Sequence, residues 1–271
     1  MSRFHNIGIY AAAFAAVLLF CHASQAAPSQ SQSQSQPDVR AQVESLLREH
    51  PEIVLDVLRG HSEEVLDIAQ QGAEKRRRQT LLSQWENDRK NPKSVALEGR
   101  PVGGPADAPV TVIAFSDFLC TYCHQAAFTL GTLMKRYQGK IRLIFKQVPK
   151  DEPGRVAGCW FLAAYEQDKV KAWKMYALLF DRQHDLETDL EGTLKAVAAE
   201  VGLDAARIAS DLKAHAREHA AIMDGDAADA KSLGFVGTPY FLVNDRIIRG
   251  ALPLENFIDA VELALKDAPA K

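Results

Sequence analysis

The stretch VTVIAFSDFLCTYCH, residues 110–124, decides the fold. It opens with alternating and then continuous apolar residues up to Phe115, which is the pattern of a buried strand. Cys120 and Cys123 follow, and the apolar residues after them recur at helical spacing, so the cysteine pair is predicted where a strand ends and a helix begins. A thiol in the first turn of a helix faces unpaired backbone N–H groups and the positive end of the helix dipole, and both favour the thiolate.

The composition is that of an ordinary globular protein. The 271 residues are 47% hydrophobic and 25% charged, and the net charge of −3 does not indicate a nucleic-acid-binding surface. Four cysteines are too few for a disulfide framework in a chain of this length. No cofactor is expected.

The first 26 residues have the pattern of a secretory signal peptide. Arg3 is followed by an apolar run over residues 7–21 and by small residues around Ser24. The run is shorter than the roughly 18 apolar residues of a membrane span, and bulky Phe20 before Cys21 argues against a lipoprotein cysteine. Removal of residues 1–26 would leave three cysteines in a compartment where disulfides persist.

Residues 27–37 form a Ser/Gln-rich linker, and residues 38–92 are predicted to be helical, with helices over about 38–50, 51–60 and 62–90. About 50 helical residues are too few to build a core of their own, so their apolar sides need either the main domain or another copy of the chain. We expect a homo-oligomer, dimer or trimer, formed through residues 38–90. The basic run at 75–78 is interpreted as a solvated helix face.

The remaining chain, residues 93–267, is predicted to be one α/β domain. It has a short strand at about 95–97, the strand at 110–115, a second core strand at 141–145 and a helical insertion over 154–234. The dipeptide Thr238-Pro239 then introduces a strand at 240–243, a tight turn at Asn244-Asp245, a strand at 246–249 and a last helix at 254–265.

This order of motifs resembles the thioredoxin fold in its DsbA-like form. The resemblance covers about residues 95–265, and its landmarks are the CTYC motif and the later Gly-Thr-Pro. The N-terminal helices resemble those of ScsC-like proteins, exported disulfide isomerases of this fold that oligomerise through such a segment. The resemblance implies an α/β thioredoxin-like fold with a helical insertion, preceded by an α-helical segment, in a periplasmic protein.

The resemblance also implies roles for the motif residues. Cys120 would be the attacking thiolate, with a pKa within about 3.5–7.5, and Cys123 the resolving cysteine. Thr121 and Tyr122, between them, would tune the stability of dithiol against disulfide. Pro239 would be cis and lie against the disulfide, which leaves the backbone of the residue before it free to pair with an extended substrate.

One departure concerns ionisable neighbours. Many DsbA-like proteins carry an acid where this chain has Ala114, so Asp117 and Lys146 become the candidates for proton transfer. Threonine at 238 resembles the isomerase branches. The resemblance therefore implies an exported thiol–disulfide oxidoreductase acting on protein disulfides, with isomerisation or reduction favoured and a monomeric DsbA-type oxidant as the alternative. Its partners would be exported client proteins with thiols or disulfides and a membrane redox partner.

Two other motifs in the chain match signatures of different functions. Cys120 to His124 also spells C-x-x-C-H, the attachment motif of c-type haem, with His124 as one axial ligand and Met134, Met175 or Met223 as the other. The buried strand before the motif favours the thiol interpretation, in which His124 tunes the site.

The stretch His215 to His219 fits H-x-x-E-H, a zinc-peptidase signature. It is polar and lacks a third ligand in a comparable motif, so it is interpreted as a solvated helix face. Cys159 is expected to be a buried free thiol, with a third redox cysteine as the alternative.

Overall fold

The computed structural model describes residues 38–268 and divides the chain into two compact units, one ending at Val65 and the other beginning at Leu66. The predicted signal peptide and Ser/Gln linker, residues 1–37, lie outside the described residues. No helix within residues 38–268 combines the length and the apolar character needed to cross a membrane.

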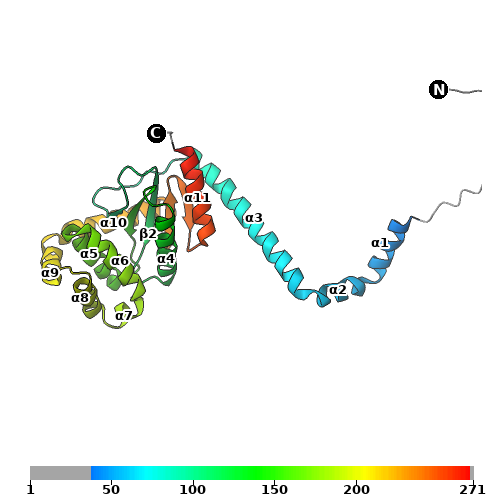
Figure 1. Cartoon of the computed structure of the whole chain (residues 1–271), viewed down its shortest axis with the longest axis horizontal. Coiled ribbons are helices and arrows are strands. Elements are labelled where there is room, and N and C mark those ends of the chain that lie inside the picture. Colours follow the sequence, from blue (N-terminus) through cyan, green and yellow to red (C-terminus); the bar gives the residue numbers. More distant parts are fainter. Residues whose placement is uncertain (1–37, 269–271) are drawn as a thin grey trace, which may run out of the picture. The chain divides into compact units, whose positions relative to one another are not determined.

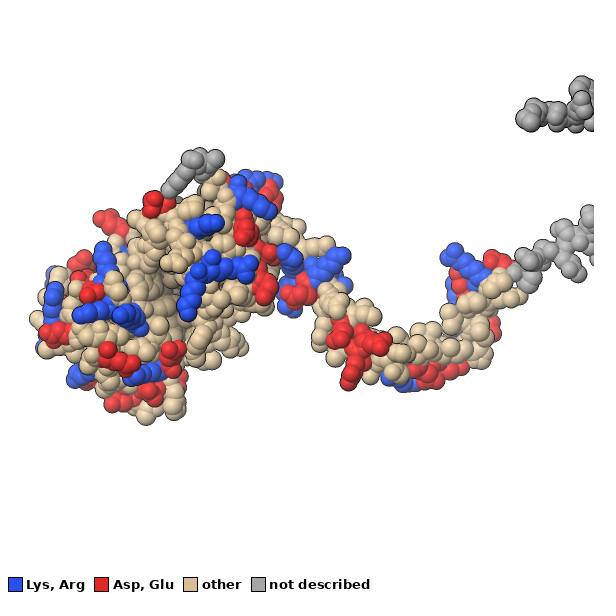
Figure 2. Space-filling view, in the orientation of Figure 1, with Lys and Arg blue, Asp and Glu red and all other residues tan. Residues whose placement is uncertain are grey.

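The first unit contains α1 (Val39–Glu49), α2 (Pro51–Gly60) and the start of α3 (Ser62–Lys90), close to the predicted bounds. Asp38 caps α1 by accepting a hydrogen bond from the backbone N–H of Arg40 at 3.1 Å, and Pro51 occupies the first turn of α2. No side chain of α1 or α2 is buried. In Figure 2 the charged side chains of α2 lie along its lower edge, and uncharged side chains occupy the opposite edge.

The second unit is built on a five-stranded mixed sheet with the order β1-β3-β2-β4-β5. The strands are β1 (Val102–Gly103), β2 (Val110–Ser116), β3 (Ile141–Gln147), β4 (Tyr240–Val243) and β5 (Arg246–Arg249). Only β2 and β3 are parallel, and their crossover is α4 (Thr121–Arg136). The thioredoxin-like fold class predicted from the sequence is confirmed.

The helices cover both faces of this sheet. The insertion supplies α5 (Glu152–Gln167), α6 (Lys169–Asp181), α7 (Gln183–Thr188), α8 (Leu190–Glu200), α9 (Ala205–Ala214) and α10 (Ala216–Ser232). The last helix, α11 (Leu254–Asp267), lies beside α4 (Figure 1). The six-residue helix α7 was not predicted because it is too short to show a helical period.

The predicted strand at 95–97 was wrong. The edge strand is β1, five residues later, where Val102 pairs with Ile144. Val95 and Leu97 instead pack their side chains against an apolar cluster on the sheet. Their alternation reflects this packing and not pairing in the sheet.

The alternation of strand residues separates two apolar clusters. Val112 and Ala114 of β2 face the larger cluster with α4, α11 and most of the insertion, while Ile113 and Phe115 face a smaller one that contains Phe235. The larger cluster includes Cys123, and Cys120 packs against it.

The end of α3 belongs to this second unit. Trp85 is 1% exposed and donates its indole N–H to the carbonyl of Ile247 at 2.8 Å, while the Asp88 carboxylate accepts the N–H of Ile247 at 3.1 Å. The second compact unit therefore begins within α3, at Leu66.

Candidate active site at the cysteine pair

The two cysteines lie at the start of α4, one turn apart. Cys120 has extended backbone angles and precedes the first helical residue, and its carbonyl accepts the N–H of Cys123 at 2.9 Å. Cys120 is half-buried, whereas Cys123 is 1% exposed, and both are free thiols. A reagent in solvent therefore meets Cys120 first.

The pKa values of the two thiols are driven apart. A hydrogen bond from the Cys123 side chain lowers the pKa of Cys120 to about 5, helped by hydrogen bonds from Thr238 and from the backbone N–H groups of Cys123 and Tyr122 and opposed by burial. Burial raises the pKa of Cys123, and its bond to Cys120 raises it further. At neutral pH Cys120 is a thiolate and Cys123 is its thiol donor.

The loop before β4 contacts the exposed sulfur. The Thr238-Pro239 peptide bond is cis, and Cys120 Sγ lies 3.5 Å from the carbonyl oxygen of Thr238. Val236, nearby in this loop, is 93% exposed. The structure thus brings Cys120, Cys123 and Thr238 together from elements more than 100 residues apart in the chain.

The other predicted site residues in the motif differ in how they lie relative to the thiolate. Thr121 and Tyr122 are exposed, and Tyr122 reaches the thiolate through its backbone N–H. The His124 ring packs against the ring of Phe128, with centroids 5.4 Å apart, so it lies along α4.

Asp117 supports the backbone around the motif. Its carboxylate accepts the N–H of Leu119 and the N–H of Lys150, both at 3.1 Å, and burial raises its pKa. Gly154 packs so closely that a Cβ there would lie 2.7 Å from Asp117 Oδ1. Asp117 therefore joins the loop before the cysteines to the start of the insertion.

Lys146 lies on the other face of the sheet. It is fully buried, and its ammonium contacts Asp226 Oδ1 at 2.6 Å and Asp229 Oδ2 at 2.8 Å, both on α10. Because Phe145 faces the cluster that contains Cys123, the next residue of the strand must face away from it. The expectation that Lys146 is an ionisable neighbour of the cysteines is not supported by this placement.

Two further features of the insertion hold the cysteine loop. Gln183, at the start of α7, donates from Nε2 to the carbonyls of Phe118 at 2.7 Å and Cys120 at 2.9 Å. Phe118 itself packs against four aromatic rings at centroid distances of 5.0–5.9 Å, those of Phe145, Phe161, Tyr176 and Phe180. Sequence reasoning missed Gln183, since a lone glutamine 63 residues from the motif carries no local signal.

The H-x-x-E-H stretch is only partly solvated, which corrects the sequence interpretation. His215 is exposed, but His219 is fully buried, with Nε2 3.1 Å from Glu166 Oε1. Its Nδ1 has no hydrogen-bond partner among the described residues. Over residues 38–268 no group of three or more His, Cys, Asp and Glu side chains is arranged to hold a metal ion.

Cys159 is a free thiol that is half-buried, less than expected. Its sulfur lies 4.0 Å from the Met223 sulfur, and burial raises its pKa. The pKa of Cys159 is thus shifted in the opposite direction from the pKa of Cys120.

A family model described as thioredoxin matches residues 96–262, more than half of the chain. The chain belongs to this thioredoxin family, and its fold is DsbA-like.

Among solved structures, a thioredoxin-like oxidoreductase from Silicibacter pomeroyi is 30% identical and covers 63% of this chain and 95% of its own, with a TM-score of 0.55. The thiol-disulfide exchange protein alpha-DsbA2 from Wolbachia pipientis is 21% identical, and the match covers 70% of this chain and 98% of that protein with a TM-score of 0.54. A linker-deleted mutant of Proteus mirabilis ScsC is 17% identical, and the match covers 89% of this chain and 100% of that protein with a TM-score of 0.50. The last two likenesses show the fold alone.

Curated relatives have an unexpected name. A Na(+)/H(+) antiporter NhaA from Herminiimonas arsenicoxydans is 32% identical over 150 residues, which is 55% of this chain and 23% of the antiporter. The chain spans about a quarter of the length of the curated relatives it matches.

Proposed function

We propose that this protein is an exported, periplasmic thiol–disulfide oxidoreductase that acts on the disulfides of client proteins, with isomerisation or reduction as its main direction. The observation that carries the proposal is the asymmetry of the cysteine pair. Cys120 is partly exposed with a pKa of about 5, while Cys123 is buried with a raised pKa. Such asymmetry is what ordered thiol exchange needs.

The reaction begins when the Cys120 thiolate attacks one sulfur of a client disulfide. A bond forms between Cys120 and that sulfur, the client's S–S bond breaks, and the released client thiolate takes a proton from water. In isomerisation, another client thiolate then attacks the mixed disulfide and restores the Cys120 thiolate. In reduction, Cys123 loses its proton and attacks Cys120 Sγ, which releases the reduced client and leaves a Cys120–Cys123 disulfide.

The backbone next to the cis proline suits an extended client segment. The Thr238 carbonyl lies 3.5 Å from Cys120 Sγ, so a client strand paired with this residue would place its own sulfur beside the thiolate. A membrane redox partner would return the Cys120–Cys123 disulfide to the dithiol.

The N-terminal helices support the isomerase direction. Nine aliphatic side chains of α1 and α2 are 38–67% exposed: Val39, Val43, Leu46, Leu47, Ile53, Val54, Leu55, Val57 and Leu58. Apolar surface of this extent favours association, and we propose that copies of the chain pair through it to form a dimer or trimer. Two or three catalytic units in one assembly could hold a misfolded client while its disulfides are exchanged.

A disulfide oxidant is the second candidate, and the pKa of Cys120 favours it. A stabilised thiolate makes the dithiol more stable and the disulfide correspondingly more oxidising. The monomeric DsbA-type oxidant would share the same site and differ in direction and assembly.

One experiment separates these directions. The full chain, reduced, is assayed for recovery of active ribonuclease from its scrambled form, and, oxidised, for recovery from the reduced form. Cys120→Ser should abolish both activities, whereas Cys159→Ser, the matched control, should preserve them. An isomerase recovers the scrambled form; activity confined to the reduced form would establish the oxidant instead.

The assembly is tested by light scattering. Leu46→Glu with Val54→Glu should convert the oligomer to a monomer and lower isomerase activity, while Gln42→Glu adds a charge to α1 at a polar position and should change neither. A native chain that already runs as a monomer would remove the support for isomerisation.

A further inference from the structure

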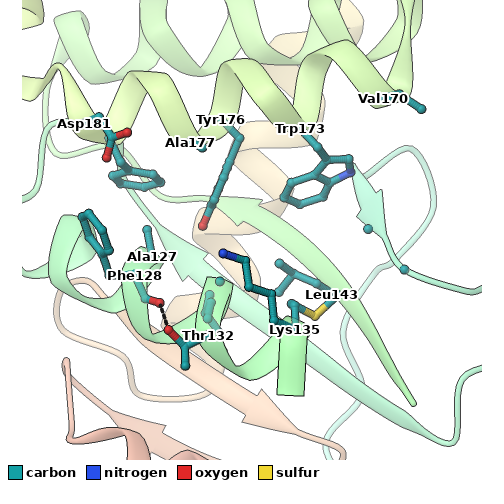
Figure 3. A pocket seen from close by; sticks show the side chains of 16 residues that line it. Ala127, Phe128, Thr132, Lys135, Leu143, Val170, Trp173, Tyr176, Ala177 and Asp181 are labelled. Carbon is teal, nitrogen blue, oxygen red and sulfur yellow. Dashed lines mark hydrogen bonds between the residues drawn. The ribbon is translucent and has the colours of Figure 1, made fainter. Parts of the chain in front are cut away.

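A pocket of about 580 Å³ lies between α4 and α6 (Figure 3), and Gly103 and Gly104 are among the residues that line it. We call it the α4–α6 pocket. Its walls include four aromatic side chains, those of Phe128, Trp173, Tyr176 and Phe180. The volume falls within the roughly 300–1,000 Å³ of pockets that bind small molecules.

The aromatic walls are held in place without a ligand. The Trp173 indole donates its N–H to the carbonyl of Val102 at 2.9 Å, and the rings of Trp173 and Phe180 each pack on Tyr176 with centroids 5.0 Å apart. Phe128, on the α4 side, is 63% exposed. Three of the four aromatic walls are therefore preformed, which lowers the cost of binding.

Two hydrogen-bond donors in this pocket lack acceptors. Tyr176 is 8% exposed, yet within residues 38–268 its hydroxyl has no hydrogen-bond partner. The Lys135 ammonium likewise has no ion-pair partner in that part of the chain. Figure 3 shows the Lys135 amine and the Tyr176 hydroxyl turned toward each other from opposite walls.

Lys135 is exposed, and its ammonium and the Tyr176 hydroxyl both line the pocket, so a ligand oxygen between them can accept a hydrogen bond from each. The positive charge of Lys135 favours an anionic oxygen, because charge-assisted hydrogen bonds are the stronger ones. Asp181 lines the pocket at a distance from Lys135 in the view of Figure 3 and would repel an anion there. The charges therefore direct an acidic head group to the Lys135 side.

We infer that the α4–α6 pocket binds a small amphipathic carboxylate. Its carboxylate accepts hydrogen bonds from Lys135 Nζ and the Tyr176 hydroxyl, and its apolar body lies against Trp173 and the other aromatic walls. This binding activity is separate from thiol exchange and does not depend on it.

The test titrates the full chain with decanoate by isothermal calorimetry and compares it with decyltrimethylammonium, which has the same chain length and the opposite charge. Decanoate should bind and the cation should not. Lys135→Gln should weaken decanoate about tenfold, and Tyr176→Phe should weaken it by a smaller factor. Lys174→Gln, an exposed lysine of α6 outside the pocket, is the matched control and should leave binding unchanged.

A second variant fills the pocket without disturbing the helix. A Cβ at Gly131, which lines the pocket, would meet no atom within 4 Å, so Gly131→Leu should abolish binding while the thermal midpoint stays at or above that of the native chain. Equal binding of decanoate and the cation, no binding of decanoate, or undiminished binding to Gly131→Leu would each overturn the inference.

Discussion

Replacing Cys123 with alanine is expected to raise the pKa of Cys120 from about 5 toward the ordinary range, because the hydrogen bond from Cys123 is the largest cause of the lowering. At pH 7 a pKa of about 5 leaves about 99% of Cys120 as thiolate, against about 3% for an ordinary cysteine with a pKa of about 8.5. The rate of attack at pH 7 depends on both the thiolate fraction and the nucleophilicity of the thiolate. The thiolate fraction gains about 30-fold, but a fall of about 3.5 in pKa lowers the intrinsic nucleophilicity about 25- to 55-fold, so the two effects nearly cancel.

The midpoint of the titration is therefore the diagnostic quantity, and not the rate at pH 7. Ultraviolet thiolate absorbance of the reduced protein should rise with a midpoint near pH 5, and the midpoint should move up in Cys123→Ala. Cys159→Ala is the control, because the raised pKa of Cys159 keeps it protonated in this range. A native midpoint above pH 8, or one that Cys123→Ala leaves unmoved, would refute the account of the site.

The same shift has a consequence for stability. The pKa of Cys120 is lower in the folded protein than in the unfolded chain, so its ionisation stabilises the reduced protein. This contribution to the free energy of unfolding is fully present above the unfolded pKa of about 8.5 and is lost as the pH falls toward 5. Denaturant titrations of the native chain and of Cys120→Ser should therefore converge near pH 5. Trp85→Ala should lower the free energy of unfolding by about 3–5 kcal/mol, measured by denaturant titration, and an effect below about 1 kcal/mol would contradict the burial of α3's last turns. Gln183→Ala should cost about 1–3 kcal/mol, because two backbone carbonyls lose their donor; an unchanged unfolding midpoint would show that water replaces it. Lys146→Met should cost about 1.5–3 kcal/mol by removing a charge-assisted hydrogen bond from the buried Asp226, which keeps Arg100 as its other cation. It should leave the Cys120 midpoint in place, and a moved midpoint would contradict the position of Lys146 across the sheet.

The local elements around the motif were predictable because their signals are local. The apolar run ending at Phe115 and the helical spacing after Cys123 each lie within a few residues of the strand and the helix that they determine. The burial of Cys123 relative to Cys120 follows from one helical turn. The Thr238-Pro239 loop was placed by resemblance, and the structure brings it to the thiolate.

What could not be predicted depends on contacts distant in sequence. Gln183 is recognisable only once α7 is seen beside Cys120, and the burial of His219 depends on Glu166 of another helix. The position of β1 depends on which residues of the loop pair with Ile144 of β3, a contact about 40 residues away along the chain that leaves no local signal. The orientation of Lys146, by contrast, was available from strand alternation and was overlooked.

The aromatic packing around Phe118 also bears on how this domain can be divided. Three of the four rings that hold Phe118, and the amide that holds the Cys120 carbonyl, come from the inserted helices. The insertion is thus not an accessory that could be excised to recover a minimal thioredoxin. A chimera that exchanged residues 154–234 for those of a relative would inherit the relative's support for the cysteine loop, and its redox chemistry would follow the donor of the helices as much as the donor of the motif.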